Sequence, residues 1–296
     1  MDLLIARVLD GASNGVVYGF IGLSLVVVFR GSGYLNFAQG EMAMFSAYFA
    51  WALHAGGLPI LAAAIVATAA AFVAGLVVER VLIRPLGHDA EYQVIIVTIG
   101  LFLAINAAAA AIWSPDPLNF PSLVPSGPNS YVSVLGKRVQ YDELLMLGVL
   151  LAILMILFAI FRYTRFGLAM RIATSNPESG ILLGIRVSRV NAFGWAIAAA
   201  IGALAAILVA PSTSLTPSFM FNFLIYGAAA AMLGGFDSPG GAVLAGVVLG
   251  IGENIVSSYV DMVGSDLKQG FALVVILAVL MLRPSGLFGS KRIERV

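Results

Sequence analysis

The sequence has 296 residues, of which 60% are hydrophobic and only 10% are charged, whereas soluble domains carry about 25% charged residues. This composition leaves no room for a sizeable soluble domain. The net charge of +1 gives no support for nucleic-acid binding, and the absence of cysteine excludes disulfides, thiolate metal sites and cysteine nucleophiles.

Long apolar segments predict a helical membrane protein. About 20 apolar residues cross a bilayer core of about 30 Å, and charges and Gly/Pro clusters divide the chain into such segments. We expect one all-α, polytopic transmembrane domain over residues 1–296, with an N-terminal helix that is retained rather than cleaved. Nine spans are predicted, and eight with one re-entrant segment is the alternative; the nine lie near 9–29, 37–55, 58–78, 92–113, 143–161, 190–210, 218–235, 240–260 and 267–282.

The distribution of lysine and arginine predicts the orientation. Twelve of the 16 lie at Arg30, in residues 79–91, in residues 162–189 and after residue 282. Nine alternating spans place all four regions on one side, which the positive-inside rule assigns to the cytoplasm. The C-terminus is therefore expected in the cytoplasm, and residues 114–141 outside.

Residues 114–141 form the longest predicted outer loop, which contains five of the twelve prolines. Its second part, residues 131–141, is typical of a small β-hairpin turning near Gly136. The loop is either a plain surface loop or a docking surface for an external protein.

Two glycine-rich interruptions, residues 30–41 and 233–241, divide apolar stretches in the two halves of the chain. Such paired interruptions indicate broken helices in a transporter with internal repeats, here about 1–141 and 142–296. Two ordinary connecting turns are the alternative. The broken-helix interpretation makes Asn36, Gln39, Glu41, Gly234 and Gly235 candidate residues of a transport pathway.

Two further patterns lie inside the predicted spans. Glu253, beside Asn254, is an acid within an apolar segment, so it is a pathway candidate, although it could instead belong to an internal polar network. Glycines at four-residue spacing, 11, 15 and 19 in one span and 246 and 250 in another, predict close helix packing.

The residue inventory argues against an enzyme. The two histidines, His54 and His88, have no partners at the spacing of a metal site or a catalytic pair. The chain also has no phosphate-binding loop of the Gly-x4-Gly-Lys-Ser/Thr type. We therefore expect no bound cofactor or metal, and no ATP hydrolysis by this chain.

Residues 162–189 form the most informative predicted loop. Asn176 is a suitable N-cap for a short helix, with Pro177 in its first turn and Glu178 at its positive end. We expect this helix, residues 176–185, to lie along the membrane surface with Leu182, Leu183 and Ile185 available for docking.

This loop resembles the cytoplasmic loop of ABC importer permeases, in which Gly follows Glu by six residues, as Gly184 follows Glu178 here. The chain resembles more specifically the branched-chain amino acid permease family, in its LivH-type branch. The similarity runs in family order through residues 18–25, 35–41, 79–80, 83–86, 164–171, 176–178, 183–185, 233–236 and 282–289.

The resemblance implies a permease subunit in the bacterial inner membrane that carries branched-chain or other hydrophobic amino acids, or related amides or urea. The implied partners are a second permease subunit, two cytoplasmic ATP-binding subunits and an external solute-binding protein. The residues implied to couple the chain to the ATPase are Arg171, Asn176, Pro177, Glu178, Leu183, Gly184 and Ile185.

One residue departs from the family pattern, and other functional classes stay open. The family commonly has histidine where this chain has Gln39, and glutamine cannot titrate near neutral pH, so this position offers no protonatable group. A secondary transporter or channel that works without ATPase subunits is the main alternative function, and a membrane scaffold subunit is a third.

Overall fold

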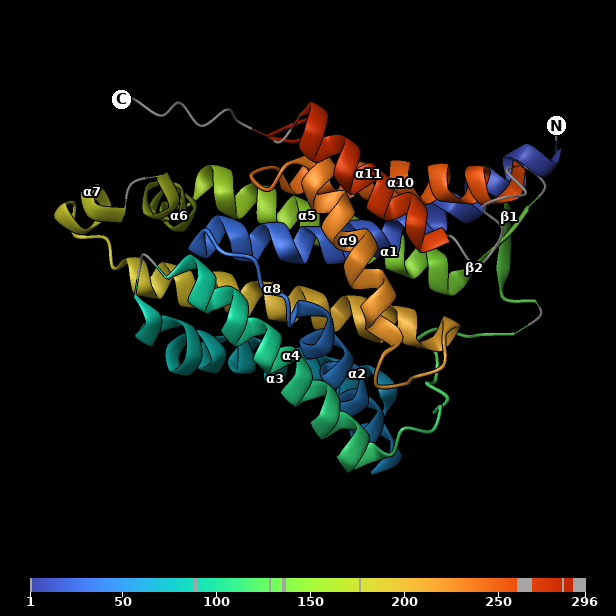
Figure 1. Ribbon diagram of the computed structural model, residues 1–296. Helices are drawn as coiled ribbons and strands as arrows, with labels where there is room; N and C mark the ends of the chain where they lie inside the picture. Colours follow the sequence, from blue (N-terminus) through green and yellow to red (C-terminus); the bar gives the residue numbers. More distant parts are fainter. Residues whose placement is uncertain are drawn as a thin grey trace.

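The computed structural model describes residues 2–87, 90–127, 129–134, 137–175, 177–259, 268–283 and 285–289. The chain is an all-α bundle with one small β-hairpin (Figure 1). The long helices are α1 (Asp2–Ser32), α2 (Gln39–Ala55), α3 (Ile60–Val78), α4 (Glu91–Trp113), α5 (Tyr141–Tyr163), α8 (Val187–Val209), α9 (Phe219–Gly234), α10 (Pro239–Tyr259) and α11 (Lys268–Leu282).

Each of the nine predicted spans overlaps one of these helices, which confirms the predicted polytopic helical bundle. Six of them, α1, α3, α4, α5, α8 and α10, are long and apolar enough to cross a membrane, and α9 and α11 contain shorter apolar segments. Only 11% of the most apolar stretch of α4 is buried, against 78% in α1 and α8. Helix α4 therefore lies at the outer surface of the bundle with apolar side chains exposed, whereas α1 and α8 form the core.

Helices α1 and α10 are in direct backbone contact. A methyl group on Gly15 would lie 2.5 Å from the Cα of Val247, and one on Gly11 would lie 2.6 Å from the Cα of Ile251. Both distances are too short for any side chain. The prediction of close packing at the spaced glycines is therefore confirmed, and the two glycine patterns pack against each other.

Helix α3 continues past the predicted end of its span. One turn of π-helix (Glu79–Ile83) and a short 3₁₀ segment (Arg84–Leu86) follow it directly. Glu79 is buried and accepts a 2.7 Å bond from the Arg84 guanidinium. Because the charge is paired within the same helix, the chain can keep its helical form at a position where a charge predicts a loop.

The predicted hairpin is present at one end of the bundle. Strands β1 (Tyr131–Val134) and β2 (Lys137–Gln140) pair antiparallel, with Val134 opposite Lys137. Lys137 forms an ion pair with Asp10 of α1. The hairpin is therefore attached to the N-terminal helix.

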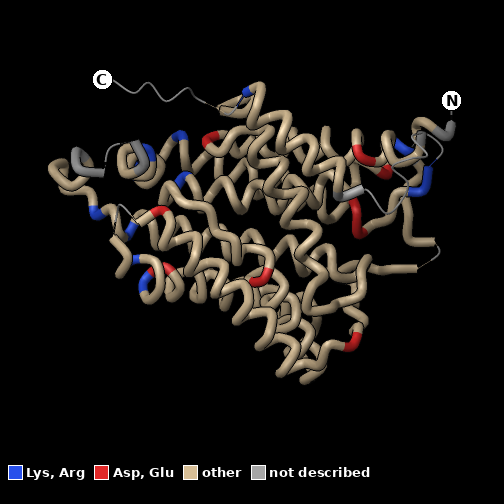
Figure 2. Tube along the Cα trace, in the orientation of Figure 1, with Lys and Arg blue, Asp and Glu red and all other residues tan. Residues whose placement is uncertain are grey.

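The opposite end of the bundle holds the two short helices α6 (Arg165–Ser175) and α7 (Pro177–Leu182) (Figure 1). Figure 2 shows lysine and arginine gathered at this end, with a smaller group beside the hairpin. Placing residues 162–189 and the hairpin at opposite ends is what nine alternating spans require.

Candidate functional site

The connection between α1 and α2 returns into the bundle instead of remaining at its surface (Figure 1). Asn36 and Gln39 are 1% and 0% exposed. The Asn36 side chain holds the turn, because its carbonyl oxygen accepts a bond of 3.0 Å from the Ala38 N–H. The turn over residues 33–38 thus links two separate helices, and the buried Asn36 side chain is hydrogen-bonded within it.

Gln39 joins this turn to the core helix α8. Its amide donates to the Ala198 carbonyl at 2.8 Å, and its carbonyl accepts from Asn36 at 3.1 Å. A methyl group on Gly202, one turn further along α8, would lie 2.6 Å from the Gln39 amide nitrogen. Ala198 is the middle residue of α8, so this polar contact lies near mid-depth of the bundle.

Glu41 extends the polar cluster to α4 and to the segment that precedes α9. One carboxylate oxygen accepts from the Asn106 amide at 3.2 Å, and the same amide donates to the Pro217 carbonyl at 2.7 Å. Glu41 is 1% exposed, and its other oxygen, Oε1, has no hydrogen-bond partner among the described residues. A buried carboxylate oxygen without a donor is energetically costly and therefore marks a candidate binding atom.

We call Asn36, Gln39, Glu41 and Asn106 the amide–acid cluster. The sequence pointed to the first three, and the structure brings them together. The sequence did not point to Asn106. This residue is the only amide in the apolar stretch 94–113, and a lone amide in a span is a usable signal.

Glu253 lies outside this cluster and joins α10 to α1 and α9. Its carboxylate accepts from the Tyr18 hydroxyl at 2.6 Å, and the Tyr18 ring stacks on Tyr226 with centroids 4.3 Å apart. The neighbouring Asn254 amide donates to the Arg7 carbonyl. In this structure Glu253 thus belongs to an internal polar network, which is the alternative role considered for it from the sequence.

Gly234 and Gly235 occupy the crowded turn between α9 and α10. Gly235 has φ +95°, and a methyl group on it would lie 2.6 Å from the Gly289 nitrogen. The segment after α11 folds onto this turn, since the Leu287 N–H donates to the Leu233 carbonyl. Among the described residues, no hydrogen bond or close backbone approach joins these glycines to the amide–acid cluster, so the two interrupted segments occupy different places in the bundle.

Residues 162–189 contain an additional helix, α6, that the sequence pattern did not indicate. Thr164 caps it, because its hydroxyl accepts from the Gly167 N–H at 3.2 Å. Phe166, Met170 and Ala173 face the bundle at helical spacing. Arg171 donates to the Phe161 carbonyl at the end of α5, so this residue anchors α6 within the chain.

The short helix expected over residues 176–185 is present in part, as the six-residue α7. Asn176, its predicted N-cap, lies outside the described residues, and so does the side chain of Glu178. Gly184 has φ +78° and ends the helix in a Schellman motif: the Ile185 N–H donates to the Gly180 carbonyl, and the Gly184 N–H donates to the Ile181 carbonyl. Among the described residues, no atom beyond the chain neighbours of Gly184 lies within 4 Å of a methyl group placed on it.

Three large apolar side chains are exposed at the end of α7. Ile181, Leu182 and Leu183 are 57%, 87% and 71% exposed. Ile185, expected to be available for docking, is partly buried against the core instead. We call Ile181, Leu182 and Leu183 the α7 apolar patch.

Comparisons with known proteins agree with this architecture. The family model described as branched-chain amino acid transport system / permease component matches residues 7–282. The high-affinity branched-chain amino acid transport system permease protein BraD of Pseudomonas aeruginosa is 28% identical to this chain. The match covers 98% of this chain and 97% of the BraD chain. The corresponding protein LivH of Escherichia coli is 27% identical with the same coverage.

A more distant relative and one solved structure extend these findings. The probable branched-chain amino acid transport permease protein LivH of Methanocaldococcus jannaschii is 25% identical over 100% of this chain and 96% of its own. The structure of PsaBC from Streptococcus pneumoniae in complex with Fab matches 93% of this chain and 91% of its own, with a TM-score of 0.51 and 11% identity. This structural likeness concerns the fold alone.

Proposed function

We propose that this chain, which belongs to the branched-chain amino acid transport permease family, is the permease subunit of an ABC importer. Its proposed substrates are branched-chain or related hydrophobic amino acids. The observation that carries the proposal is the family match over 7–282. Except for the first residues of α1, this range includes the six helices of the described residues that are long and apolar enough to span a membrane. Related small amides or urea are the other substrates considered.

The proposal requires partner subunits. The sequence contains no phosphate-binding loop, so ATP hydrolysis is assigned to two cytoplasmic ATP-binding subunits. A second permease subunit completes the pathway, and an external solute-binding protein delivers the substrate. The proposed location is the bacterial inner membrane with a cytoplasmic C-terminus.

The α7 apolar patch is the proposed contact with an ATP-binding subunit. Its three apolar side chains project at the end of the bundle where lysine and arginine gather (Figure 2), which the positive-inside rule assigns to the cytoplasm. Helix α7 is linked to the core through α6, since Arg171 bonds to the end of α5. A force on α7 would therefore reach the spans through this bond and through α8.

The amide–acid cluster is the proposed polar part of the pathway. It lies near mid-depth, where transporters of this general design hold their substrates, and it joins α2, α4, α8 and the segment that precedes α9. The Glu41 oxygen that has no partner among the described residues would accept a hydrogen bond from the ammonium group of an amino acid once α2 and α4 separate.

Uptake of labelled leucine into proteoliposomes tests the proposal. Vesicles contain this chain, the second permease, the ATP-binding subunits and the binding protein. We expect uptake that requires ATP and the binding protein. Uptake that persists without the ATP-binding subunits would identify a secondary transporter or channel instead.

Two substitutions and a control test the pathway assignment in the same assay. Glu41→Gln keeps the shape of the side chain but removes its charge, and we expect it to lower uptake more than tenfold while the complex still assembles. Gln39→Ala should lower uptake as well, whereas Gln93→Ala alters an exposed glutamine on α4 and should have no effect. Wild-type uptake by both Glu41→Gln and Gln39→Ala would refute the assignment.

A further inference from the structure

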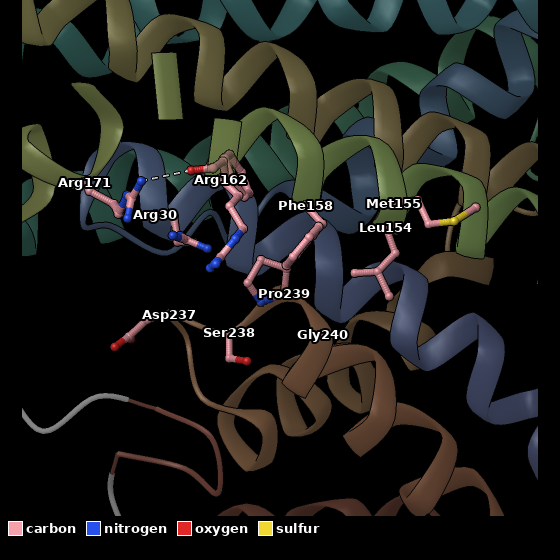
Figure 3. A pocket seen from close by; sticks show the side chains of 11 residues that line it. Arg30, Leu154, Met155, Phe158, Arg162, Arg171, Asp237, Ser238, Pro239 and Gly240 are labelled. Atoms are coloured by element: carbon pink, nitrogen blue, oxygen red, sulfur yellow. Dashed lines mark hydrogen bonds between the residues drawn. The ribbon is translucent and has the colours of Figure 1, made fainter. Parts of the chain in front are cut away.

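A cavity of about 630 Å³ opens at the end of the bundle that carries α6. It is lined by the end of α1, the last turns of α5, α6 and the turn that leads into α10 (Figure 3). This cavity is separate from the amide–acid cluster, with which it shares no lining residue.

Positive charge dominates the polar part of the cavity lining. The guanidinium groups of Arg30, Arg162 and Arg171 lie together on one side, and the single carboxylate, Asp237, lies across from them (Figure 3). Three cations and one anion leave a net charge of +2. Such a lining is suited to an anionic group, and guanidinium groups bind phosphate oxygens in particular.

The start of α10 adds to this electrostatic preference. Ser238, Pro239 and Gly240 line the cavity, and Ser238 caps the helix by accepting from the Gly241 N–H at 3.1 Å. The positive end of a 21-residue helix therefore borders the space that the arginines occupy.

The other wall of the cavity is apolar and belongs to α5. Leu154, Met155 and Phe158 line it, and Met155 and Phe158 are 66% and 58% exposed. Arg162 follows on the same helix, one residue before its end. A spanning helix thus presents an apolar surface that ends at a cluster of arginines at membrane-surface level.

We propose that this cavity binds an anionic phospholipid of the cytoplasmic leaflet. The phosphate lies among Arg30, Arg162 and Arg171, and an acyl chain lies along Met155 and Phe158. A phospholipid has an anionic group joined directly to long apolar chains, and basic pockets between spans on the cytoplasmic side suit such lipids. An acidic peptide would match the arginines but not the apolar wall of a spanning helix. The proposal does not depend on the transported substrate.

Lipid retention on the purified full-length chain tests the proposal. Native mass spectrometry measures how much phosphatidylglycerol or phosphatidylcholine, with identical acyl chains, stays bound after detergent extraction. We expect clear preference for phosphatidylglycerol. Arg162→Gln should weaken its retention about fivefold, as expected for one basic residue near an anionic lipid. Arg162→Lys should restore most of it.

The controls distinguish a bound anionic phospholipid from non-specific lipid retention and from inorganic phosphate. Arg189→Gln removes an exposed arginine at the same end that does not line the cavity, and retention should not change. Equal retention of the two lipids by the wild-type chain would overturn the proposal without any variant. Displacement of phosphatidylglycerol by inorganic phosphate at equal concentration would also overturn it, because the acyl chains would then contribute nothing.

A last outcome concerns a protein occupant. If Arg162→Gln released the ATP-binding subunits and left phosphatidylglycerol retention unchanged, the cavity would be a docking site for an acidic segment, and the lipid proposal would be wrong. Lipid retention is measured without transport, so failure here is distinguishable from failure of the proposed function.

Discussion

Replacing Gly184 distinguishes two explanations for the glycine at the end of α7. One is the spacing to Glu178, which would reflect a close approach between this backbone and that of an ATP-binding subunit. The other is local: φ is +78° and the Schellman motif needs a left-handed residue at this place. The described residues leave the space within 4 Å of a side chain at this position empty, so that part of the chain sets no size limit.

The local explanation gives the magnitude of the effect. A left-handed backbone costs most residues about 1–2 kcal/mol, and asparagine is one of the few side chains that adopt it readily. Gly184→Ala should therefore lower the population of the capped α7 end about 5- to 30-fold relative to the uncapped one. Gly184→Asn adds a larger side chain but should retain most of the capped form.

ATP-driven leucine uptake, measured with ATPase retention on the complex, reports the consequence. We expect both leucine uptake and ATPase retention to be highest with glycine at position 184, lower with asparagine and lowest with alanine. If Gly184→Asn loses as much coupling as Gly184→Ala or more, the size of the side chain, and not the backbone conformation, determines the loss. The close-approach explanation would then be the better one.

Three further predictions concern packing and topology. Gly15→Ala should destabilise the chain by about 1–3 kcal/mol through overpacking. Gly148→Ala should not, because no atom of the described residues lies within 4 Å of the added methyl group; gel filtration after heating compares the two variants, and equal melting would contradict the prediction. Tyr18→Phe removes the donor to a buried carboxylate and should cost about 1–3 kcal/mol in the same assay; an unchanged melting temperature would count against it. In this cysteine-free chain, Gln140→Cys should react with an impermeant thiol reagent from outside and Leu182→Cys only after permeabilisation, and the reverse pattern would invert the topology.

Hydropathy was sufficient to predict the number and order of the long helices, but their ends depended on interactions between distant residues. The first helix was expected over 9–29 and runs from Asp2 to Ser32. Asp10 could be included because Lys137 pairs with it. Glu79 was taken as an end signal, and its pairing with Arg84 allowed the helix to continue.

The candidate site was predictable only in part, for a similar reason. Residues 35–41 were identified from composition and resemblance, but neither could show that Asn106 of α4 bonds to Glu41. Helix α6 was missed because its mixed sequence resembles a polar loop, and the Thr164 cap was the local signal for it. The division into two repeated halves stays a prediction.

The contact between α1 and α10 limits how this molecule can move. The two helices come from opposite ends of the chain, and at Gly11 and Gly15 only backbone atoms separate them. Any sliding would drive main-chain atoms into one another, since packed interiors resist gradual deformation. We therefore expect α1 and α10 to move together as one rigid body. Relative movement must then come from α2 and α4, where the Asn106 amide can exchange its hydrogen-bond partners as the two helices separate.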